Sequence, residues 1–253
     1  MTADATNPKN WFEQGGRAYA RFRPEYPAAL ARFLGETAPA RERAVDVGCG
    51  NGQLAVQLAA HFGEVVGLDP SADQIANTTA HERVRYIRAP AENIPLPDRC
   101  ADLVTAAQAA HWFDLPRFYD EVRRIGRRNA VVALVSYGVL RLEPTELGER
   151  FSRFYRNEIG PYWPPERRLV DSGYADVAFP FAEFAAPEFS IEHEWELGDF
   201  LGYVSTWSAT QRAIEADRKD ILENFAADLS ALWGADGRKR QVSWPINMRI
   251  GRL

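Results

Sequence analysis

The sequence predicts an α/β fold built on a doubly wound, mostly parallel β-sheet. Short apolar segments alternate with helical segments through residues 43–138, as in parallel sheets whose strands are joined by helices. The first apolar segment runs directly into a glycine-rich turn, "DVGCGNG". The chain has 253 residues, of which 46% are hydrophobic, so it can bury a large core.

The elements of the first half follow from this alternation. A helix is expected over residues 25–36, with Pro27 near its start. Asp114 is a suitable N-cap, and Gly126 a suitable end, for the most amphipathic helix. Five strands are expected, at residues 43–48, 64–70, 84–89, 101–109 and 130–138. The intervening helices are expected at residues 51–63, 71–82 and 114–126.

The pattern changes after Gly138. The alternating segment "EFSIEHEWELG" predicts a strand, and "RQVSWPINMRIGRL" predicts a last, antiparallel strand. Residues 198–235 predict two helices. We therefore expect about seven strands in one domain, residues 1–253. Its sheet core comprises about residues 40–138 and 179–197 with 241–253, and its helical cover about residues 1–39, 140–178 and 198–235.

Composition and charge exclude several classes of protein. The formal net charge of −5 argues against a nucleic-acid partner, because phosphate binding needs a basic face. The two cysteines form no CxxC motif, and the histidines and acids show no metal-ligand spacing, so we predict no disulfide and no metal. The N-terminus does not resemble a signal peptide, and no apolar stretch is long enough to span a membrane. We expect a soluble, cytoplasmic protein.

The glycine turn predicts a nucleoside site. Gly48, Gly50 and Gly52 let the backbone turn tightly and approach a ligand. Asp69, 17 residues after Gly52, ends the next strand, where an acid can accept hydrogen bonds from ribose hydroxyls. The GxGxG spacing differs from the dinucleotide fingerprint GxGxxG, and Asp46 would repel a pyrophosphate but attract an amino group. The ligand should therefore carry adenosine and a cationic amino-acid portion. An unliganded turn, with Asp69 acting as a helix cap, is the alternative.

Four segments carry a resemblance to a known family. "VDVGCGNG", "VVGLDPS", "APAENIPLPD" and "ADLVTAAQAAHWFD" resemble, in order, the motifs of class I S-adenosylmethionine-dependent methyltransferases. The flanking segments "AYARFRPEYP", "PYWPPERRLVDSGYADVAFPF" and "YVSTWSATQ" resemble the small-molecule branch, similar to trans-aconitate and ubiquinone/menaquinone-pathway methyltransferases. The resemblance implies a Rossmann-like fold, S-adenosyl-L-methionine as cofactor and S-adenosyl-L-homocysteine as product.

The resemblance also implies cofactor-binding residues. Asp69 would hold the ribose hydroxyls, and Gln108 would lie by the methionine portion. Tyr19 and Arg23 would close over the cofactor, with Arg21 as the alternative to Arg23. The full set is Tyr19, Arg23, Asp46, Gly48, Gly50, Asn51, Asp69, Pro70, Ser71, Ala91, Glu92 and Gln108.

The sequence defines the substrate-binding residues less well than the cofactor-binding residues. His111 ends the fourth strand's motif and is a candidate base or substrate-orienting group, or else a structural histidine. An aromatic cover suits a planar substrate, although such rings can also fill the cover's own core. Arg141, Arg167 or Arg168 could instead bind a carboxylate, as the trans-aconitate resemblance suggests. The expected substrate-binding residues are His111, Trp112, Tyr162, Trp163, Tyr203 and Trp207.

The sequence therefore predicts in-line methyl transfer to N or O of a small, planar, aromatic or heterocyclic metabolite of secondary metabolism, by a monomer or homodimer. A trans-aconitate-type carboxyl O-methyltransferase, a C-methyltransferase and a non-catalytic S-adenosylmethionine-binding regulator are the alternatives. Nucleic-acid methylation is disfavoured because "QAAH" replaces the NPPY-type tetrapeptide, and a dehydrogenase is disfavoured by the glycine spacing.

Overall fold

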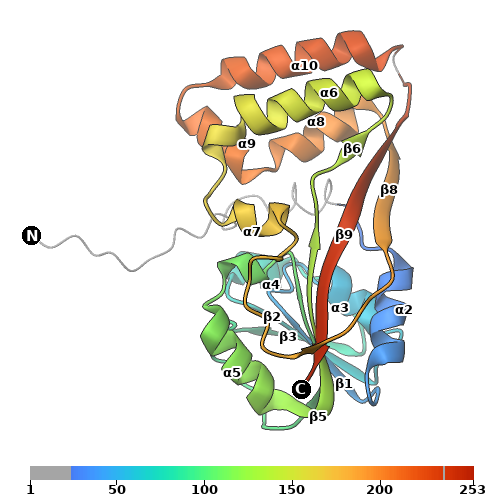
Figure 1. The fold of residues 1–253 in the computed structure, drawn as a ribbon, viewed down its shortest axis with the longest axis vertical. Helices are drawn as coiled ribbons and strands as arrows, with labels where there is room; N and C mark the ends of the chain where they lie inside the picture. The colour runs from blue at the N-terminus through green and yellow to red at the C-terminus, as the bar shows by residue number, and fades with distance from the viewer. Residues whose placement is uncertain (1–23, 236) are drawn as a thin grey trace, which may run out of the picture.

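A single twisted sheet runs through the molecule, with helices packed on it and gathered beyond one end (Figure 1). The structure, a computed structural model, describes residues 24–235 and 237–253. Within these residues the sheet has nine strands, in the order β3-β2-β1-β4-β5-β9-β6, with β7 and β8 also paired to β9. The pairs among β1 to β5 are parallel and every pair with β9 is antiparallel. The predicted doubly wound sheet with an antiparallel last strand is confirmed.

The strands follow the apolar segments of the sequence. They are β1 Arg43–Val47, β2 Glu64–Asp69, β3 Val84–Arg88, β4 Ala101–Ala107, β5 Gly126–Tyr137, β6 Arg141–Leu142, β7 Ala182–Glu183, β8 Phe189–Trp195 and β9 Arg240–Arg252. The count exceeds the expected seven because β6 and β7 are two-residue strands that only their pairing with β9 reveals.

The helices are shorter than expected in the core and more numerous in the cover. They are α2 Ala28–Thr37, α3 Gln53–Leu58, α4 Ala72–Ala76, α5 Leu115–Ile125, α6 Thr145–Arg153, α7 Arg167–Asp171, α8 Leu197–Ser205, α9 Ser208–Glu215 and α10 Lys219–Trp233. The two helices expected over residues 198–235 are three, because the chain turns at Thr206–Trp207 and again at Asp217, whose φ is +57°. Asp114 caps α5 as expected, its carboxylate accepting from the Arg117 N–H.

The sheet is buried on both faces by two apolar clusters. Strands β1, β2 and β4 are buried almost throughout, as expected of strands covered on both sides. One cluster joins the face under α2 and α3 to the aromatic residues of the cover, and the other lies under α5. None of the helices in the described ranges combines the length and apolar character needed to cross a bilayer.

Strand β9 connects the sheet to the cover. Its C-terminal half pairs with β5 and its N-terminal half pairs with β8. The cover helices α6, α8, α9 and α10 gather at the far end of this strand, and α7 lies between them and the parallel strands (Figure 1). Parallel α/β sheets bind ligands at the carboxyl ends of their strands, and α7 and the cover face these ends.

At the amino ends of the parallel strands, Asp102 is a buried carboxylate near the start of β4. Its Oδ2 accepts from the backbone N–H groups of Glu42 (2.9 Å) and Arg43 (3.0 Å), and its Oδ1 lies 3.0 Å from Nη1 of Arg127. This single side chain therefore ties the start of β1 to β4 and β5.

Replacing Asp102 with Ala should lower the free energy of unfolding by about 3 kcal/mol, since it leaves two backbone donors without their acceptor and removes one of the two carboxylates that pair with Arg127. Urea denaturation of the variant and of wild type measures the difference. Asp98→Ala is the matched control, because that carboxylate is 74% exposed and makes a surface ion pair. Equal effects of the two substitutions would contradict the role given to Asp102.

Candidate functional site

The glycine turn between β1 and α3 depends on left-handed backbone. Gly48, Gly50 and Gly52 have φ values of +69°, +55° and +90°, a region that residues with a Cβ rarely adopt. The N–H groups of Gly48 and Cys49 donate to the carbonyl of Leu68, at 2.7 and 2.9 Å. The turn therefore folds over the carboxyl end of β2.

The three glycines differ in what surrounds them. A Cβ on Gly48 would collide with the side chain of Ala109, and one on Gly52 with the ring of Tyr86. A Cβ on Gly50 would meet only Oε1 of Gln74, at 3.6 Å. Packing thus requires two of the glycines, whereas Gly50 presents bare backbone to open space that a ligand could fill.

Asp69 holds this turn in place. Its Oδ2 accepts from the N–H of Gly50 and its Oδ1 from the N–H of Ser71, both at 2.9 Å. Burial raises the pKa of Asp69, and these two hydrogen bonds oppose the rise. Ser71 itself is the N-cap of α4, its hydroxyl accepting from the Gln74 N–H. Asp69 thus orients the turn and the start of α4, and its remaining lone pairs can accept from a ligand hydroxyl.

Asp46 is a buried carboxylate with one unused oxygen. Its Oδ1 accepts from the hydroxyl of Thr105 at 2.7 Å, whereas Oδ2 has no hydrogen-bond partner among the described residues. Burial, with the nearby charge of Asp69, raises the pKa of Asp46 to about 7. Buried polar atoms are almost always hydrogen-bonded, so this oxygen marks a place for a donor, and most favourably for a cationic one.

Further unpartnered atoms lie at the same edge. Gln108, directly after β4, has a φ of +52°, and its Nε2 donates to the carbonyl of Tyr137 at 3.3 Å. Its Oε1 has no partner in the described part of the chain, and neither has the hydroxyl of the fully buried Ser136 on β5. The carboxyl ends of β1, β4 and β5 thus carry several polar atoms that a polar ligand could satisfy.

His111 belongs to the short 3₁₀ helix η1 (Ala110–Trp112), which follows β4. Its Nδ1 lies 3.1 Å from the hydroxyl of Tyr174, a fully buried residue with a φ of +63°. Burial, and then the charge of Arg167, lower the pKa of His111 to about 3. His111 is therefore neutral at physiological pH, and where Nδ1 accepts from the phenol, Nε2 carries the ring proton.

Arg167 brings a cation to this side of the site. Its Nε donates to Oδ1 of Asp171 at 2.9 Å and to the hydroxyl of Tyr155 at 3.0 Å. Its guanidinium lies 4.7 Å from the ring centre of Trp163. Nη1 and Nη2 have no hydrogen-bond partner among the residues described, and the side chain is 18% exposed. Arg167 thus keeps donors free beside His111.

The structure brings most of the expected cofactor residues together. Those at the carboxyl ends of β1, β2 and β4 are Asp46, Gly48, Gly50, Asn51, Asp69, Pro70, Ser71 and Gln108. Ala91 and Glu92 follow β3, and Glu92 accepts from the Asp114 N–H at 2.8 Å. Tyr19, Arg21 and Arg23 lie outside the described residues.

The expected substrate residues fall into two groups. Tyr203 and Trp207 are each 4% exposed and belong to the cover's aromatic core, where Trp207 packs against five rings. Tyr162, Trp163 and His111 are half-buried, and Trp112 is 37% exposed. Nε1 of Trp163 has no partner in the described residues. Of these rings, Trp163 lies against Arg167, and Trp112 belongs to η1 with His111.

Sequence reasoning missed the partners that hold this group. Tyr174, Tyr155 and Asp171 orient His111 and Arg167. The segment "DSGYAD", with a glycine before Tyr174, indicates a turn but not its contact with residue 111.

Comparisons with known proteins agree with this geometry. Residues 45–134 match a family model described as a methyltransferase domain. A Dictyostelium discoideum protein named as a methyltransferase is 33% identical, over 100% of this chain and 99% of its own. A structure named as a type II methyltransferase from Anaeromyxobacter dehalogenans is 47% identical, with a TM-score of 0.86 over 91% of this chain and 98% of that one. The malonyl-[acyl-carrier protein] O-methyltransferase of Pectobacterium atrosepticum is 33% identical over 49% of this chain and 51% of its own.

The raised pKa of Asp46 predicts a pH-dependent stability difference. In the folded state this carboxyl keeps its proton to about pH 7, against an ordinary pKa of 3.8, so its contribution to stability is lost as pH rises through 7. Asp46→Asn cannot ionise. The variant should therefore gain up to about 4 kcal/mol relative to wild type between acidic and mildly alkaline pH.

Urea denaturation of both proteins at several pH values measures this difference. Asp98→Asn, on an exposed carboxylate, is the control and should show no such trend. A stability difference between Asp46→Asn and wild type that stays constant with pH would rule out a buried, proton-retaining Asp46.

Proposed function

Because the chain belongs to the class I S-adenosylmethionine-dependent methyltransferases, we propose that it transfers a methyl group to a carboxylate oxygen of a small metabolite. The observation that carries this proposal is Arg167, a partly buried cation beside a neutral histidine, whose two terminal nitrogens have no hydrogen-bond partner among the described residues. The sequence leaves a carboxylate acceptor as the alternative to a planar aromatic one. The burial of Tyr203 and Trp207 in the core of the cover favours the carboxylate.

The cofactor half of the site fits the expected ligand. When bound, S-adenosylmethionine supplies an electrophilic methyl group on a sulfonium. Oδ2 of Asp46 would accept from its ammonium group, and Oε1 of Gln108 would lie by the same portion. Asp69 would accept from the ribose hydroxyls, and the bare backbone at Gly50 leaves room beside them. We assign the adenine to Pro70, Ser71, Ala91 and Glu92, and closure of the site to Tyr19 and Arg23.

Arg167 is suited to bind a carboxylate. Asp171 and Tyr155 engage only Nε, so they fix the plane of the guanidinium and leave its two terminal nitrogens for a ligand. Trp163 covers one face of the guanidinium and adds an indole N–H without a described partner. A carboxylate that pairs with Arg167 through one oxygen keeps the second oxygen free to attack a methyl group.

The state of His111 also favours a carboxylate acceptor. A histidine with a pKa of about 3 is too weak a base to take a proton from a phenol or an ammonium group. A carboxylate is ionised at neutral pH and needs no base. His111 can then orient the acceptor through its ring N–H. The Pectobacterium relative is named as an O-methyltransferase of malonyl-[acyl-carrier protein], and a malonyl group carries a carboxylate, which supports the same acceptor group.

A planar aromatic or heterocyclic acceptor is the second candidate. It is favoured by the ring of Trp163, which lies against Arg167, and by the exposed ring of Trp112 in η1. Tyr203 and Trp207, which were expected to bind such an acceptor, do not support this candidate, because they pack into the core of the cover. The two candidates differ in product, because a methyl ester releases methanol in mild base and an N-methyl or aryl O-methyl group does not.

The experiment is a labelled-methyl transfer screen on pooled carboxylic acids and pooled aromatic metabolites, followed by kinetics on Arg167 variants. We expect base-labile products from the acid pool. Arg167→Met should raise KM by about 30-fold or more, since it removes a charge-assisted pair, while the affinity for S-adenosylhomocysteine stays unchanged. Arg167→Lys should recover part of the loss, and Arg168→Met, next to it but exposed, should behave as wild type.

Base-stable products, or an Arg167→Met variant with wild-type KM, would exclude carboxyl methylation. Binding of S-adenosylhomocysteine without any transfer would favour the regulator alternative instead. Loss of cofactor binding in Arg167→Met would place Arg167 in the cofactor site.

His111 provides a further prediction. If it orients the substrate and does not accept a proton, turnover should not follow a histidine titration between pH 6 and 8. His111→Gln, which keeps a hydrogen-bonding side chain, should retain kcat to within about tenfold, and Tyr174→Phe should act in the same direction. The pH profile of kcat for the three proteins is the measurement. A fall of kcat by about a thousandfold in His111→Gln would show general-base catalysis.

A further inference from the structure

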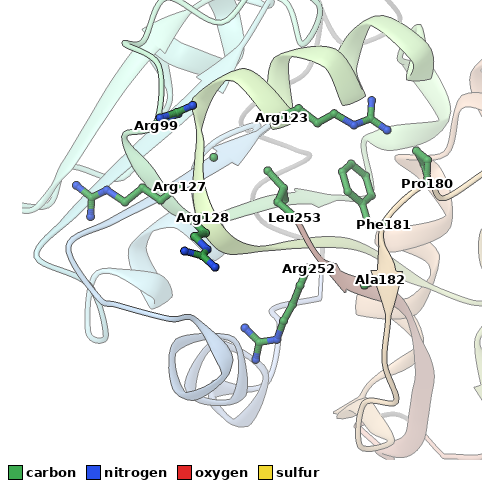
Figure 2. A pocket seen from close by; sticks show the side chains of 10 residues that line it. Arg99, Arg123, Arg127, Arg128, Pro180, Phe181, Ala182, Arg252 and Leu253 are labelled. Atoms are coloured by element: carbon green, nitrogen blue, oxygen red, sulfur yellow. The ribbon is translucent and has the colours of Figure 1, made fainter.

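A second hollow lies at the edge of the sheet opposite the glycine turn. It is a cavity of about 510 Å³ at the amino ends of β4 and β5 and the end of β9 (Figure 2). Its lining residues are Arg99, Arg123, Gly126, Arg127, Arg128, Pro180, Phe181, Ala182, Arg252 and Leu253. We propose that this cavity binds an organic phosphate with a planar or apolar portion, such as a nucleotide.

Positive charge is concentrated around the cavity. Five arginines, from the turn before β4, the end of α5, the start of β5 and the end of β9, surround the cavity, although the chain as a whole carries a formal charge of −5. We call Arg99, Arg123, Arg127, Arg128 and Arg252 the arginine rim. Such a local concentration of one sign, drawn from separated segments, creates a potential that attracts anions.

Acidic side chains compensate only part of the rim. Nη1 of Arg127 pairs with Asp102 at 3.0 Å and with Glu42 at 2.6 Å. Arg123 pairs with Asp120 at 3.3 Å, both side chains being well exposed, so this pair is weak.

The other three arginines of the rim have no carboxylate side chain as partner in the described residues. Arg252 donates to the backbone carbonyls of Asn129 and Thr37, at 3.4 and 3.1 Å. The side chains of Arg99 and Arg128 are exposed and make no hydrogen bond or ion pair within residues 24–235 and 237–253. Their ten N–H donors are available to a ligand.

The ligand class follows from the number of donors. A phosphate offers more oxygens and more charge than a carboxylate, so one phosphate or diphosphate can pair with two or three guanidinium groups at once. Figure 2 shows Arg128 and Arg252 bordering one part of the cavity, with the other rim arginines spaced around it. A diphosphate or triphosphate suits such spaced donors better than a single small anion does.

The apolar wall indicates the remainder of the ligand. Phe181 and Pro180 border the cavity opposite Arg128 and Arg252 (Figure 2), and Leu253 also lines it. The guanidinium of Arg123 lies 5.3 Å from the centre of the Phe181 ring. An aromatic ring beside a cation is a stacking surface for a planar group. The volume is within the range of small-molecule sites.

The proposal does not rest on the proposed function. The cavity shares no residue with the glycine turn, Asp69, His111 or Arg167, and it opens at the other end of the strands. Occupancy of the cofactor site therefore leaves the rim free.

The test is calorimetric titration of the full chain with ATP, inorganic pyrophosphate and adenosine, at physiological ionic strength. Saturating S-adenosylhomocysteine blocks the cofactor site. We expect saturable binding of ATP and of pyrophosphate, and none of adenosine. The double variant Arg99→Ala/Arg128→Ala should bind both phosphates at least about tenfold more weakly. Because neither side chain makes a described contact, this variant should fold as wild type.

Two further variants complete the test. Phe181→Ala should weaken the binding of ATP several-fold and leave the binding of pyrophosphate unchanged. Arg117→Ala, an exposed arginine at the other end of α5, is the matched control and should bind as wild type. Absence of saturable binding of either phosphate to wild type would overturn the proposal. So would full affinity in the double variant, or an equal loss in Arg117→Ala.

Discussion

The carboxylate of Asp69 is the constraint on which the cofactor half of the site depends. Three left-handed residues within five positions are costly, and they keep one geometry only if the surrounding structure fixes it. Asp69 supplies that fixation by binding the N–H of Gly50 with one oxygen and that of Ser71 with the other. The pairing of Val47 with Leu68 brings the two strand ends level, so that Asp69 reaches the turn.

The charges around the site are divided by the topology. The acids Asp46 and Asp69 end adjacent parallel strands, whereas the cation Arg167 arrives on α7 from the cover. His111 lies on the same side as Arg167. It is neutral, since burial and the charge of Arg167 both oppose its protonation. Under the proposed function, a cationic methyl donor would lie beside the two acids and an anionic acceptor beside the arginine, so that neither would have to pass a like charge. A site for two uncharged ligands would not need this division.

Local sequence signals predicted the glycine turn and the strands beside it well, and the contacts around His111 and Arg167 poorly. The glycine turn and its strands could be recognised because consecutive residues determine them. Strand β5 begins at Gly126, not near residue 130, because the polar residues 127–129 conceal its pairing with β4. The contact of Tyr174 with His111 joins residues 63 positions apart, and no local pattern encodes it. Similarly, composition showed that the cover is aromatic, but only packing separates the core ring of Trp207 from the accessible ring of Trp163.

The packing of the cover determines where specificity can reside. Phe154 and Phe225 stack with ring centres 3.7 Å apart, and Arg150 joins α6 to α10 through Asp228. The same apolar cluster continues into the sheet beside β9, so the cover is held rigidly against the parallel strands. A rigid cover cannot adapt to different substrates by moving its core. Selectivity must therefore come from the few side chains that leave that core and reach the site. Among the described residues, Arg167 and Trp163 do so with donors unused, and on the proposed function the short segment around α7 would therefore define the acceptor.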